Sequence, residues 1–208
     1  MTGPTPEILD DLVDRIDALP ITGSRLLIAI AGPPASGKST FASALATRLN
    51  RDAPRAAIVP MDGFHLDNRI LVDRNMLARK GSPETFDAVG FIHMIQRLAT
   101  EDEIIAPIFD RNRDIAIAGA QYVSIDTRIA IVEGNYLLLN EPPWVDLQPL
   151  WALSIYLDVP ASEIERRLIQ RWLDNGLTPN DAQARARSND LPNAVRVSGN
   201  SKMADIML

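Results

Sequence analysis

The sequence predicts an α/β fold in which helices cover both faces of a parallel β-sheet. Short runs of small and branched apolar residues recur at 26–31, 56–61, 129–134, 154–159 and, more weakly, 204–208. Helical stretches lie between these runs, and strands that alternate with helices form parallel sheets. Ligands of such sheets bind beyond the carboxyl ends of the strands, so we expect the functional residues there.

The composition indicates one globular domain and excludes several kinds of site. A chain of 208 residues can bury a sizeable core in a single domain, residues 1–208. Its net charge of −6 argues against nucleic acid, and the absence of cysteine excludes disulfides, thiolate zinc sites and thiol catalysis. The acidic stretch 1–20 does not resemble an export signal, and no apolar run approaches the ~20 residues that span a bilayer. We expect a cytoplasmic protein with a small-molecule substrate that binds neither nucleic acid nor a membrane.

The first elements along the chain are a helix and a strand. Thr5 and Pro6 are typical of an N-cap and a first helical position, and an apolar stripe from Ile8 to Leu19 follows at helical spacing. Pro20 ends this helix, and the apolar strand 26–31 follows.

The stretch AGPPASGKST, residues 31–40, joins this strand to a helix expected over 41–49. Its spacing fits G-x-x-x-x-G-K-[ST], the pattern of a phosphate-binding loop. Backbone N–H groups of such a loop bind anions, Lys38 adds a charge for the outer phosphates, and the Ser39 hydroxyl can bind magnesium. A tight turn that uses glycine only for its geometry is the alternative. The loop residues expected to bind the nucleotide are Gly32, Pro33, Ala35, Ser36, Gly37, Lys38, Ser39 and Thr40.

Two acidic residues stand where strands end. Asp62 follows the strand 56–61, and Glu133 ends the strand 129–134, so both are expected to project into the crevice that holds the loop. A carboxylate can accept the proton of a hydroxyl group, and magnesium prefers oxygen ligands. Asp62 suits the first role and Glu133 the second. The alternatives are a turn-forming aspartate and a solvated acid at a strand end.

Further polar residues are expected on the acceptor side of this crevice. His65 and Asn68 follow Asp62 closely, although a structural histidine in a turn explains His65 equally well. The segment 104–126 suggests short extra strands that form a hairpin at an edge. Its charged residues line an acceptor pocket or form a charged turn: Asp110, Arg111, Arg113 and Asp114.

Between these two regions lies a further helix. Asp87 is expected to cap it, and His93 on it is interpreted as structural. Its apolar face is expected at Val89, Ile92, Ile95 and Leu98. Trp144 and Trp151, further along the chain, are interpreted as core residues.

After the fourth strand, Pro160 opens a helix that carries Arg166, Arg167 and Arg171. Phosphoryl transfer benefits from an arginine that neutralises charge on the moving group. Arg167 and Arg171 are four residues apart and share a helix face. Arg171 is the candidate for this role, either residue could contact the nucleotide, and a solvated basic face is the alternative. Residues 166–192 are expected to form a small lid.

Taken together, these stretches resemble the family of phosphate-loop kinases that contains uridine kinase, phosphoribulokinase and bacterial pantothenate kinase. The resemblance covers residues 26 to about 175, and its most specific parts beyond the loop are DGFHLDNRILVDRNMLARKGSPETFD and IVEGNYLLL. It implies a three-layer fold with a five-stranded parallel sheet in the order 2-3-1-4-5 and a lid over the nucleotide. It also implies ATP with Mg²⁺, Asp62 as the base for the acceptor hydroxyl, Glu133 at the magnesium site and Arg171 on the nucleotide side.

The resemblance differs at the acceptor pocket. Where pantothenate kinases carry Tyr-Ser-His, this chain has Phe109, Asp110 and Arg111, and the histidine that follows in uridine kinases is absent. The whole pattern, including SNDLPNA and MADIML, resembles kinase-like proteins labelled as fructose-transport-system or generic nucleoside kinases. We predict a kinase for a sugar or sugar-like polyol, with a nucleoside second and pantothenate third. Arg111 and Arg113 would also suit an acceptor that carries a phosphate or carboxylate.

Two other functional classes are less well supported by the sequence. A GTPase switch would carry an Asn/Thr-Lys-x-Asp motif, which the sequence lacks, and its third strand would end in Asp-x-x-Gly rather than Glu-Gly. A catalytically silent nucleotide-binding subunit of a transport system stays open, as does a homodimer.

Overall fold

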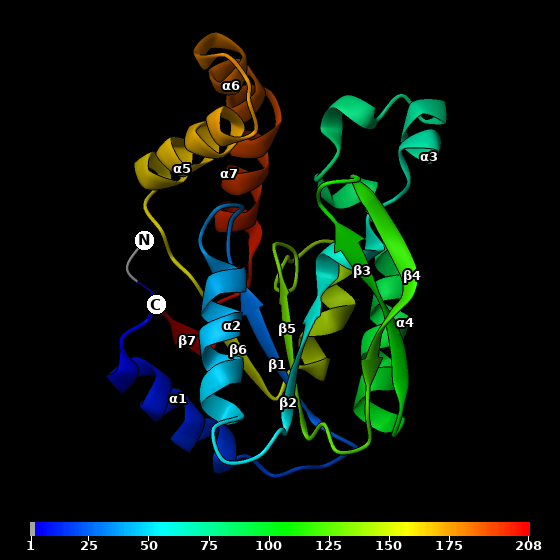
Figure 1. Ribbon diagram of the computed structural model, residues 1–208, viewed down its shortest axis with the longest axis vertical. Helices are drawn as coiled ribbons and strands as arrows, with labels where there is room; N and C mark the ends of the chain where they lie inside the picture. Colours follow the sequence, from blue (N-terminus) through cyan, green and yellow to red (C-terminus); the bar gives the residue numbers. More distant parts are fainter. Residues whose placement is uncertain (1–2) are drawn as a thin grey trace.

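In the computed structural model, which describes residues 3–208, strands and helices alternate along the chain (Figure 1). The strands are β1 (Leu26–Ala31), β2 (Ala56–Pro60), β3 (Ile104–Asp110), β4 (Ile115–Val123), β5 (Ile129–Gly134), β6 (Leu153–Tyr156) and β7 (Ile206–Met207). The α-helices are α1 (Pro6–Asp17), α2 (Lys38–Leu49), α3 (Asn68–Asp73), α4 (Ala88–Thr100), α5 (Ala161–Asp174), α6 (Pro179–Arg185) and α7 (Leu191–Asn200). Short 3-10 segments lie at Met61–Phe64, Leu77–Arg79, Pro83–Thr85 and Trp144–Leu150, and a π-helical turn, Ala186–Asp190, joins α6 to α7.

Five strands form one parallel sheet in the order β2-β5-β1-β6-β7. Counted along the chain within this sheet, the order is 2-3-1-4-5, which confirms the prediction. Glu133 of β5 pairs with Ile30 of β1 on one side and with Pro60 of β2 on the other. The carboxyl ends of β1, β2 and β5 therefore meet at one edge of the sheet, and the segments that follow them converge there.

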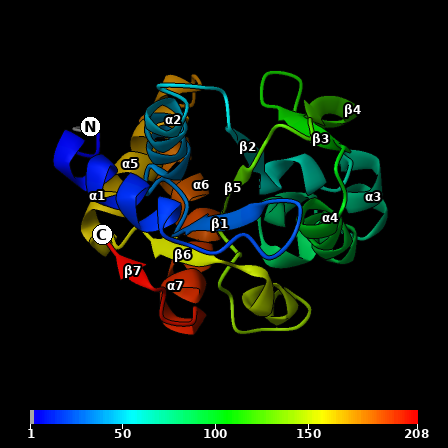
Figure 2. The same ribbon diagram turned by 90° about the horizontal axis from the view of Figure 1, so that it is seen from below.

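The sheet is the middle of three layers (Figures 1 and 2). Every residue of β1 and of β5 is buried, as expected for parallel strands covered on both faces. Ile28 and Ile30 pack with α1 and α2 on one face, whereas Ala29 and Ala31 pack with α4 and the segment 144–150 on the other. Trp144 lies in this second core, as predicted, and Trp151 packs against it while partly exposed.

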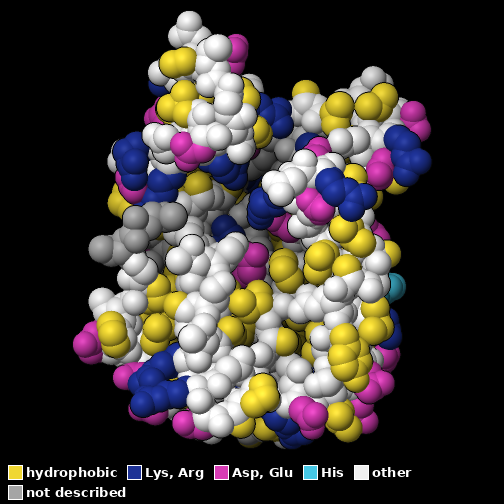
Figure 3. Space-filling view, viewed as in Figure 1, with side chains coloured by type: hydrophobic (Ala, Val, Ile, Leu, Met, Phe, Trp, Pro, Cys, Tyr) yellow, Lys and Arg dark blue, Asp and Glu magenta, His cyan; other side chains and the backbone are white. Residues whose placement is uncertain are grey.

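Two groups of elements rise above the carboxyl edge of the sheet and leave a hollow between them (Figures 1 and 3). One group is α5, α6 and α7; α5, α7 and the π-helical turn before α7 share a small apolar cluster, with Ala35 of the β1–α2 loop at its margin. The other contains α3 and the end of the β3–β4 hairpin. The residues of the apolar cluster are Ile164, Leu168, Ala186 and Ala194.

The predicted hairpin is present, with two differences from the expectation. Its second half is one strand, β4, that continues through Gly119 instead of breaking there, and β3 and β4 form a two-stranded sheet of their own. Gln121 of β4 nevertheless donates a side-chain hydrogen bond to the carbonyl oxygen of Ile58 in β2, at 2.5 Å. The hairpin is thus attached beside the edge strand β2 without extending the main sheet.

The helices largely begin where the sequence predicts. Helix α2 starts at Lys38, three residues before the expected start, and the Asp87 side chain caps α4 by accepting a hydrogen bond from the Gly90 N–H. On α4, Val89 is exposed and does not belong to the buried face, because Phe91 and Met94 occupy it with the other predicted residues. Within residues 3–208, no helix has both the length and the apolar character that crossing a membrane requires.

Candidate active site

The loop between β1 and α2 has the backbone shape that the motif predicts. Gly32 and Gly37 adopt positive φ angles of 150° and 98°, and a Cβ atom on Gly32 would lie 2.9 Å from the Leu157 carbonyl oxygen. Only glycine fits such positions without strain. The loop then turns directly into α2, so that its N–H groups and the first turn of the helix can face one anion.

Lys38 is held inside this loop. Its ammonium group donates to the carbonyl oxygen of Pro33 at 2.8 Å and to Ser36 Oγ at 3.4 Å, and the residue is only 7% exposed. Burial lowers the pKa of Lys38 to about 8, although Glu133 and Asp62 act in the opposite direction. The loop thus holds the buried ammonium group of Lys38 at a place where a bound phosphate would supply its counter-charge.

Glu133 lies next to the loop and near a second carboxylate. It accepts a hydrogen bond from Ser39 Oγ at 3.2 Å. Burial, followed by the nearby charge of Asp62, raises the pKa of Glu133. A hydroxyl and a carboxylate in contact beside a phosphate loop are oxygen donors of the kind that hold Mg²⁺ together with substrate phosphates and water. Ser39 and Glu133 therefore fit a magnesium ion.

A cleft of about 1300 Å³ runs from this loop to the hairpin, and Figure 3 shows its opening between the two raised groups. Most of the predicted site residues line it: Ala35, Gly37, Lys38, Ser39, Thr40, Asp62, His65, Arg111, Asp114, Glu133, Arg167 and Arg171. Gly32, Pro33, Ser36 and Asn68 do not line it. Pro33 and Ser36 accept hydrogen bonds from Lys38, and Asn68 contacts Asp114 and Lys80. Of the charged turn, Asp110 and Arg113 lie outside the lining and face each other, with Arg113 Nη1 3.9 Å from Asp110 Oδ2.

Asp62 and His65 line the side of the cleft next to the hairpin, where the sequence predicts the acceptor and which is called the acceptor side below. Arg111, from the turn between β3 and β4, donates to Asp62 Oδ2 at 2.5 Å. The His65 ring lies between Phe86 and Phe109, with ring centroids 4.0 and 4.5 Å away, and its Nδ1 is 2.8 Å from the Asp62 carbonyl oxygen. Burial lowers the pKa of His65, which favours the neutral ring. The His65 ring thus forms part of the cleft wall and stacks between two phenylalanine rings.

Lys80 is an acceptor-side residue that the sequence reasoning assigned no role. Its ammonium group lies 2.8 Å from Asp114 Oδ1 and 2.7 Å from Asn68 Oδ1, and 5.2 Å from the ring centre of Phe109. Asn68 also donates to Asp114 Oδ2 at 2.8 Å. Burial acts to raise the pKa of Asp114, but the hydrogen bonds from Lys80 and Asn68 outweigh it and lower that pKa. The signal was its position in KGSPETFD, within the stretch that carries the family resemblance.

The arginines of α5 lie on the opposite side of the cleft. Arg167 Nη1 donates to the carbonyl oxygens of Ala35 and Ser36, at 3.2 and 3.3 Å, so it already touches the phosphate loop. Arg171 donates to Asp190 Oδ2 at 3.0 Å, and Trp172 Nε1 donates to the same oxygen at 2.6 Å. Asp190 and Trp172 were missed: Asp190 stands in SNDLPNA, but nothing in that stretch indicates that its carboxylate meets α5.

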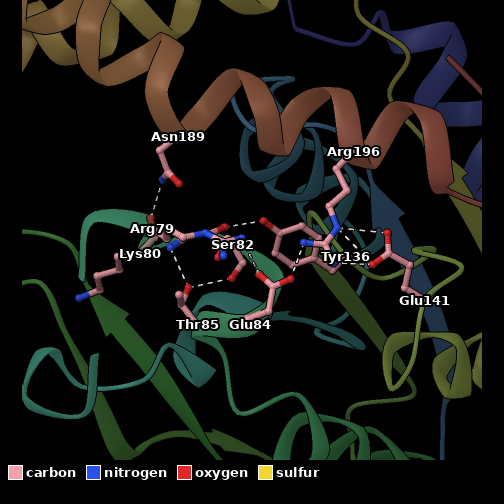
Figure 4. Close-up of polar contacts among 10 residues, drawn as sticks. Arg79, Lys80, Ser82, Glu84, Thr85, Tyr136, Glu141, Asn189 and Arg196 are labelled. Carbon is pink, nitrogen blue, oxygen red and sulfur yellow. Dashed lines mark hydrogen bonds and ion pairs between the residues drawn. The ribbon is translucent and has the colours of Figure 1, made fainter. Parts of the chain in front are cut away.

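The loop that carries Lys80 is fixed by side chains from distant parts of the chain (Figure 4). Asn189 donates to the Lys80 carbonyl oxygen at 2.9 Å, and the Tyr136 hydroxyl donates to that of Gly81. Arg196 of α7 joins Glu84 of this loop to Glu141, with contacts of 2.5 Å to each carboxylate. The backbone of the loop is therefore held from the π-helical turn, α7 and the segment that follows β5, while the Lys80 ammonium group points away toward the acceptor side.

His93 is exposed on α4 and takes no part in the cleft, as the sequence interpretation expected.

Known proteins resemble this chain in family, sequence and structure. The model of the "Phosphoribulokinase / Uridine kinase family" matches residues 27–181. A "putative uridine kinase" of Schizosaccharomyces pombe is 37% identical over 96% of this chain and 89% of its own length. A pantothenate kinase of Myxococcus xanthus is 33% identical over 71% of this chain and 49% of its own length. The crystal structure of a "putative fructose transport system kinase" from Silicibacter sp. TM1040 has a TM-score of 0.91 and 48% identity, covering 99% of this chain and 100% of that one.

Proposed function

Because the chain belongs to the phosphoribulokinase/uridine kinase family and is a phosphotransferase with an alcohol group as acceptor, we propose that its acceptor is a sugar or a sugar-like polyol. The observation that carries this proposal is that other side chains already cover the aromatic rings in the cleft. Phe109 has His65 against its ring and Lys80 at 5.2 Å from its centre, and Phe86 has His65 against its ring and meets Tyr136 edge-on. A nucleobase would need a free aromatic face, whereas sugar hydroxyls need the mixed donors and acceptors that this wall offers.

In the proposed reaction, ATP lies along the phosphate loop with the acceptor hydroxyl facing Asp62. The acceptor O–H bond breaks as its oxygen forms a bond to the γ-phosphorus, Asp62 takes the proton, and the bond between the γ-phosphorus and the bridging oxygen breaks to release ADP. Lys38 neutralises charge on the outer phosphates. Ser39 and Glu133 would hold Mg²⁺, which would supply charge neutralisation on the phosphate oxygens.

The nucleotide side completes the proposed site. Arg171 is assigned to the transferring phosphoryl group, and Arg167 to the nucleotide phosphates beside the loop that it already contacts. Residues 166–192 are proposed as the lid that closes over ATP, which is supported by their position above the loop in Figure 1. We further propose a cytoplasmic enzyme, and a homodimer favoured by Ile105 and Tyr122, which are exposed on the hairpin.

The test is a coupled ADP-release assay with Mg²⁺ over hexoses, pentoses, their phosphates, nucleosides and pantothenate. Asp62→Asn should lower kcat by about 10²–10⁴ with little change in ATP affinity, because the amide cannot accept the proton. Asp67→Asn is the matched control, since Asp67 caps α3 outside the cleft and asparagine also caps helices.

Specific turnover of uridine or cytidine, with all sugars inert, would contradict the proposal and favour the runner-up. That alternative is supported by the relative from Schizosaccharomyces pombe named for uridine. Turnover of Asp62→Asn within about tenfold of the unsubstituted protein would exclude Asp62 as the base. Inertness toward every acceptor would favour a nucleotide-binding subunit without kinase activity.

A further inference from the structure

Arg111 differs from the two lysines of the cleft, Lys38 and Lys80, in how freely it can exchange its partner. Its side chain is 68% exposed, and among residues 3–208 its one ion-pair partner is Asp62, which is 20% exposed. Lys38 is buried in the phosphate loop, and Lys80 is held by Asp114 and Asn68 together. An ion pair with one exposed partner contributes little free energy. Arg111 can therefore leave Asp62 at low cost.

The proposed reaction itself removes the partner of Arg111. When Asp62 accepts the proton of the acceptor hydroxyl it becomes neutral, whereas the arginine stays charged at any physiological pH. Lys80 does not face this problem, because its counter-ion Asp114 takes no part in the proton transfer. After the transfer Asp62 no longer balances Arg111, and the nearest new anion is the phosphoryl group that the acceptor has received.

A guanidinium group has five N–H donors in a planar fork, which matches a carboxylate or a phosphate with two parallel hydrogen bonds. Only one nitrogen of Arg111, Nη2, contacts Asp62. The rest of the fork lies beside the base, within reach of a group a few bonds from the reacting hydroxyl. This inference rests on the proposed function: we propose that Arg111 binds a carboxylate or phosphate group of the acceptor, so that the substrate is an anionic sugar derivative rather than a neutral sugar.

This assignment gives Arg111 two states. Without acceptor it pairs with Asp62 and occupies one oxygen of the base. With the anionic acceptor bound, the guanidinium turns to the substrate anion, which frees Asp62 Oδ2 for the hydroxyl proton and leaves Arg111 with a partner after the transfer. A neutral acceptor offers no such exchange and leaves the base paired.

The hairpin turn provides a matched control. Arg113 lies two residues further along the same turn and is 65% exposed, but it pairs loosely with Asp110 and does not line the cleft. Arg111→Gln and Arg113→Gln remove the same charge from the same turn, and only the first removes it from beside the base. Arg111→Lys keeps the charge but loses the fork, and it serves as a second variant if the glutamine variant folds poorly.

The experiment measures binding and turnover for three matched series of probes: glycerol, glycerate and glycerol 3-phosphate; ribose, ribonate and ribose 5-phosphate; and glucose, gluconate and glucose 6-phosphate. Binding is measured by calorimetry in the presence of Mg²⁺ and a non-hydrolysable ATP analogue, and turnover by ADP release. The carboxylate and phosphate members of each series show which of the two anions Arg111 binds.

In at least one series the anionic member should bind more tightly than the neutral one. Arg111→Gln should weaken that anion about 10–100-fold while it leaves the neutral member within about twofold, and Arg113→Gln should change neither by more than about threefold. If the affinities show this pattern but no probe is turned over, the result would support anion binding by Arg111 and would contradict the proposed kinase reaction.

Three results would overturn the inference. One is equal weakening of neutral and anionic members by Arg111→Gln, which would place Arg111 on the transferring phosphoryl group. Another is the same loss in both variants, which would indicate a general charge effect. The third is a lack of binding by every anionic probe, and turnover of a neutral sugar in that case would leave the proposed function standing alone.

Discussion

The pH dependence of ATP binding tests whether burial in the empty phosphate loop lowers the pKa of Lys38. Burial in the empty loop holds the pKa of Lys38 at about 8, whereas its ordinary value is 10.5. Bound phosphates supply a counter-charge, so the pKa of Lys38 in the ATP complex should return to about its ordinary value or above. Binding at alkaline pH must therefore take up a proton.

The size of the effect follows from these two values. At pH 8 about half of the empty protein carries an unprotonated Lys38, so each ATP bound should take up about 0.5 proton. At pH 9 only about one molecule in eleven is protonated, and the affinity should be about tenfold lower than at pH 7, or about 1.4 kcal/mol. The terminal phosphate of ATP is almost fully ionised throughout this range and contributes little.

Calorimetric titration in two buffers with different ionisation enthalpies measures this proton uptake directly. Lys38→Met, which has no titrating group, should show neither the uptake nor the tenfold loss between pH 7 and 9, although its overall affinity is lower. Uptake below about 0.1 proton at pH 8 in the unsubstituted protein would refute the reasoning, because Lys38 would then be fully charged in the empty loop.

Three further predictions follow from the same geometry. The pKa of Lys38 is lowered in the folded protein, so the unfolded chain binds more protons than the folded one between pH 8 and 10.5. The free energy of unfolding of the empty protein should therefore rise by up to about 3 kcal/mol as the pH increases across this window. Denaturant titrations should show a smaller rise for Lys38→Met. Glu133→Gln should raise the Mg²⁺ concentration for half-maximal activity at least about tenfold, since the site loses its carboxylate ligand; an unchanged Mg²⁺ titration would contradict that role. Arg196→Met leaves Glu84 and Glu141 without their shared counter-ion, so urea unfolding should show a loss of about 1–2 kcal/mol and the acceptor KM should rise while ATP affinity is kept; an equal loss of both affinities would show a merely global effect.

The parts of the site that the sequence predicted are those made by local contacts. The phosphate loop needs only its own glycines, its lysine and the helix that follows, so one motif determines its shape. Asp62 and Glu133 could be placed because each stands at a strand end, and the ends of parallel strands meet at one edge.

Long-range contacts explain what the sequence did not show. Asn189 reaches the Lys80 carbonyl across 109 residues of chain, and Arg185 reaches that of Ala78 across 107. The difference between Arg111 and Arg113 could not be predicted either, because both stand in the same charged turn and only the backbone of that turn decides which one faces the cleft.

The separation of the hairpin from the main sheet bears on how such enzymes diversify. Strands β3 and β4 pair only with each other among the described residues, and their turn carries Arg111 and Asp114, which line the cleft. Mutations and changes of length in this turn need not disturb the register of β1 and β5, on which the nucleotide machinery depends. Of the residues that we propose for the acceptor side, Arg111 and Asp114 lie on this turn, whereas Asp62, His65 and Lys80 lie on the segments between β2 and α4. A protein engineer who alters the turn would therefore change one part of the proposed acceptor pocket and leave the strands that carry the phosphate loop in register.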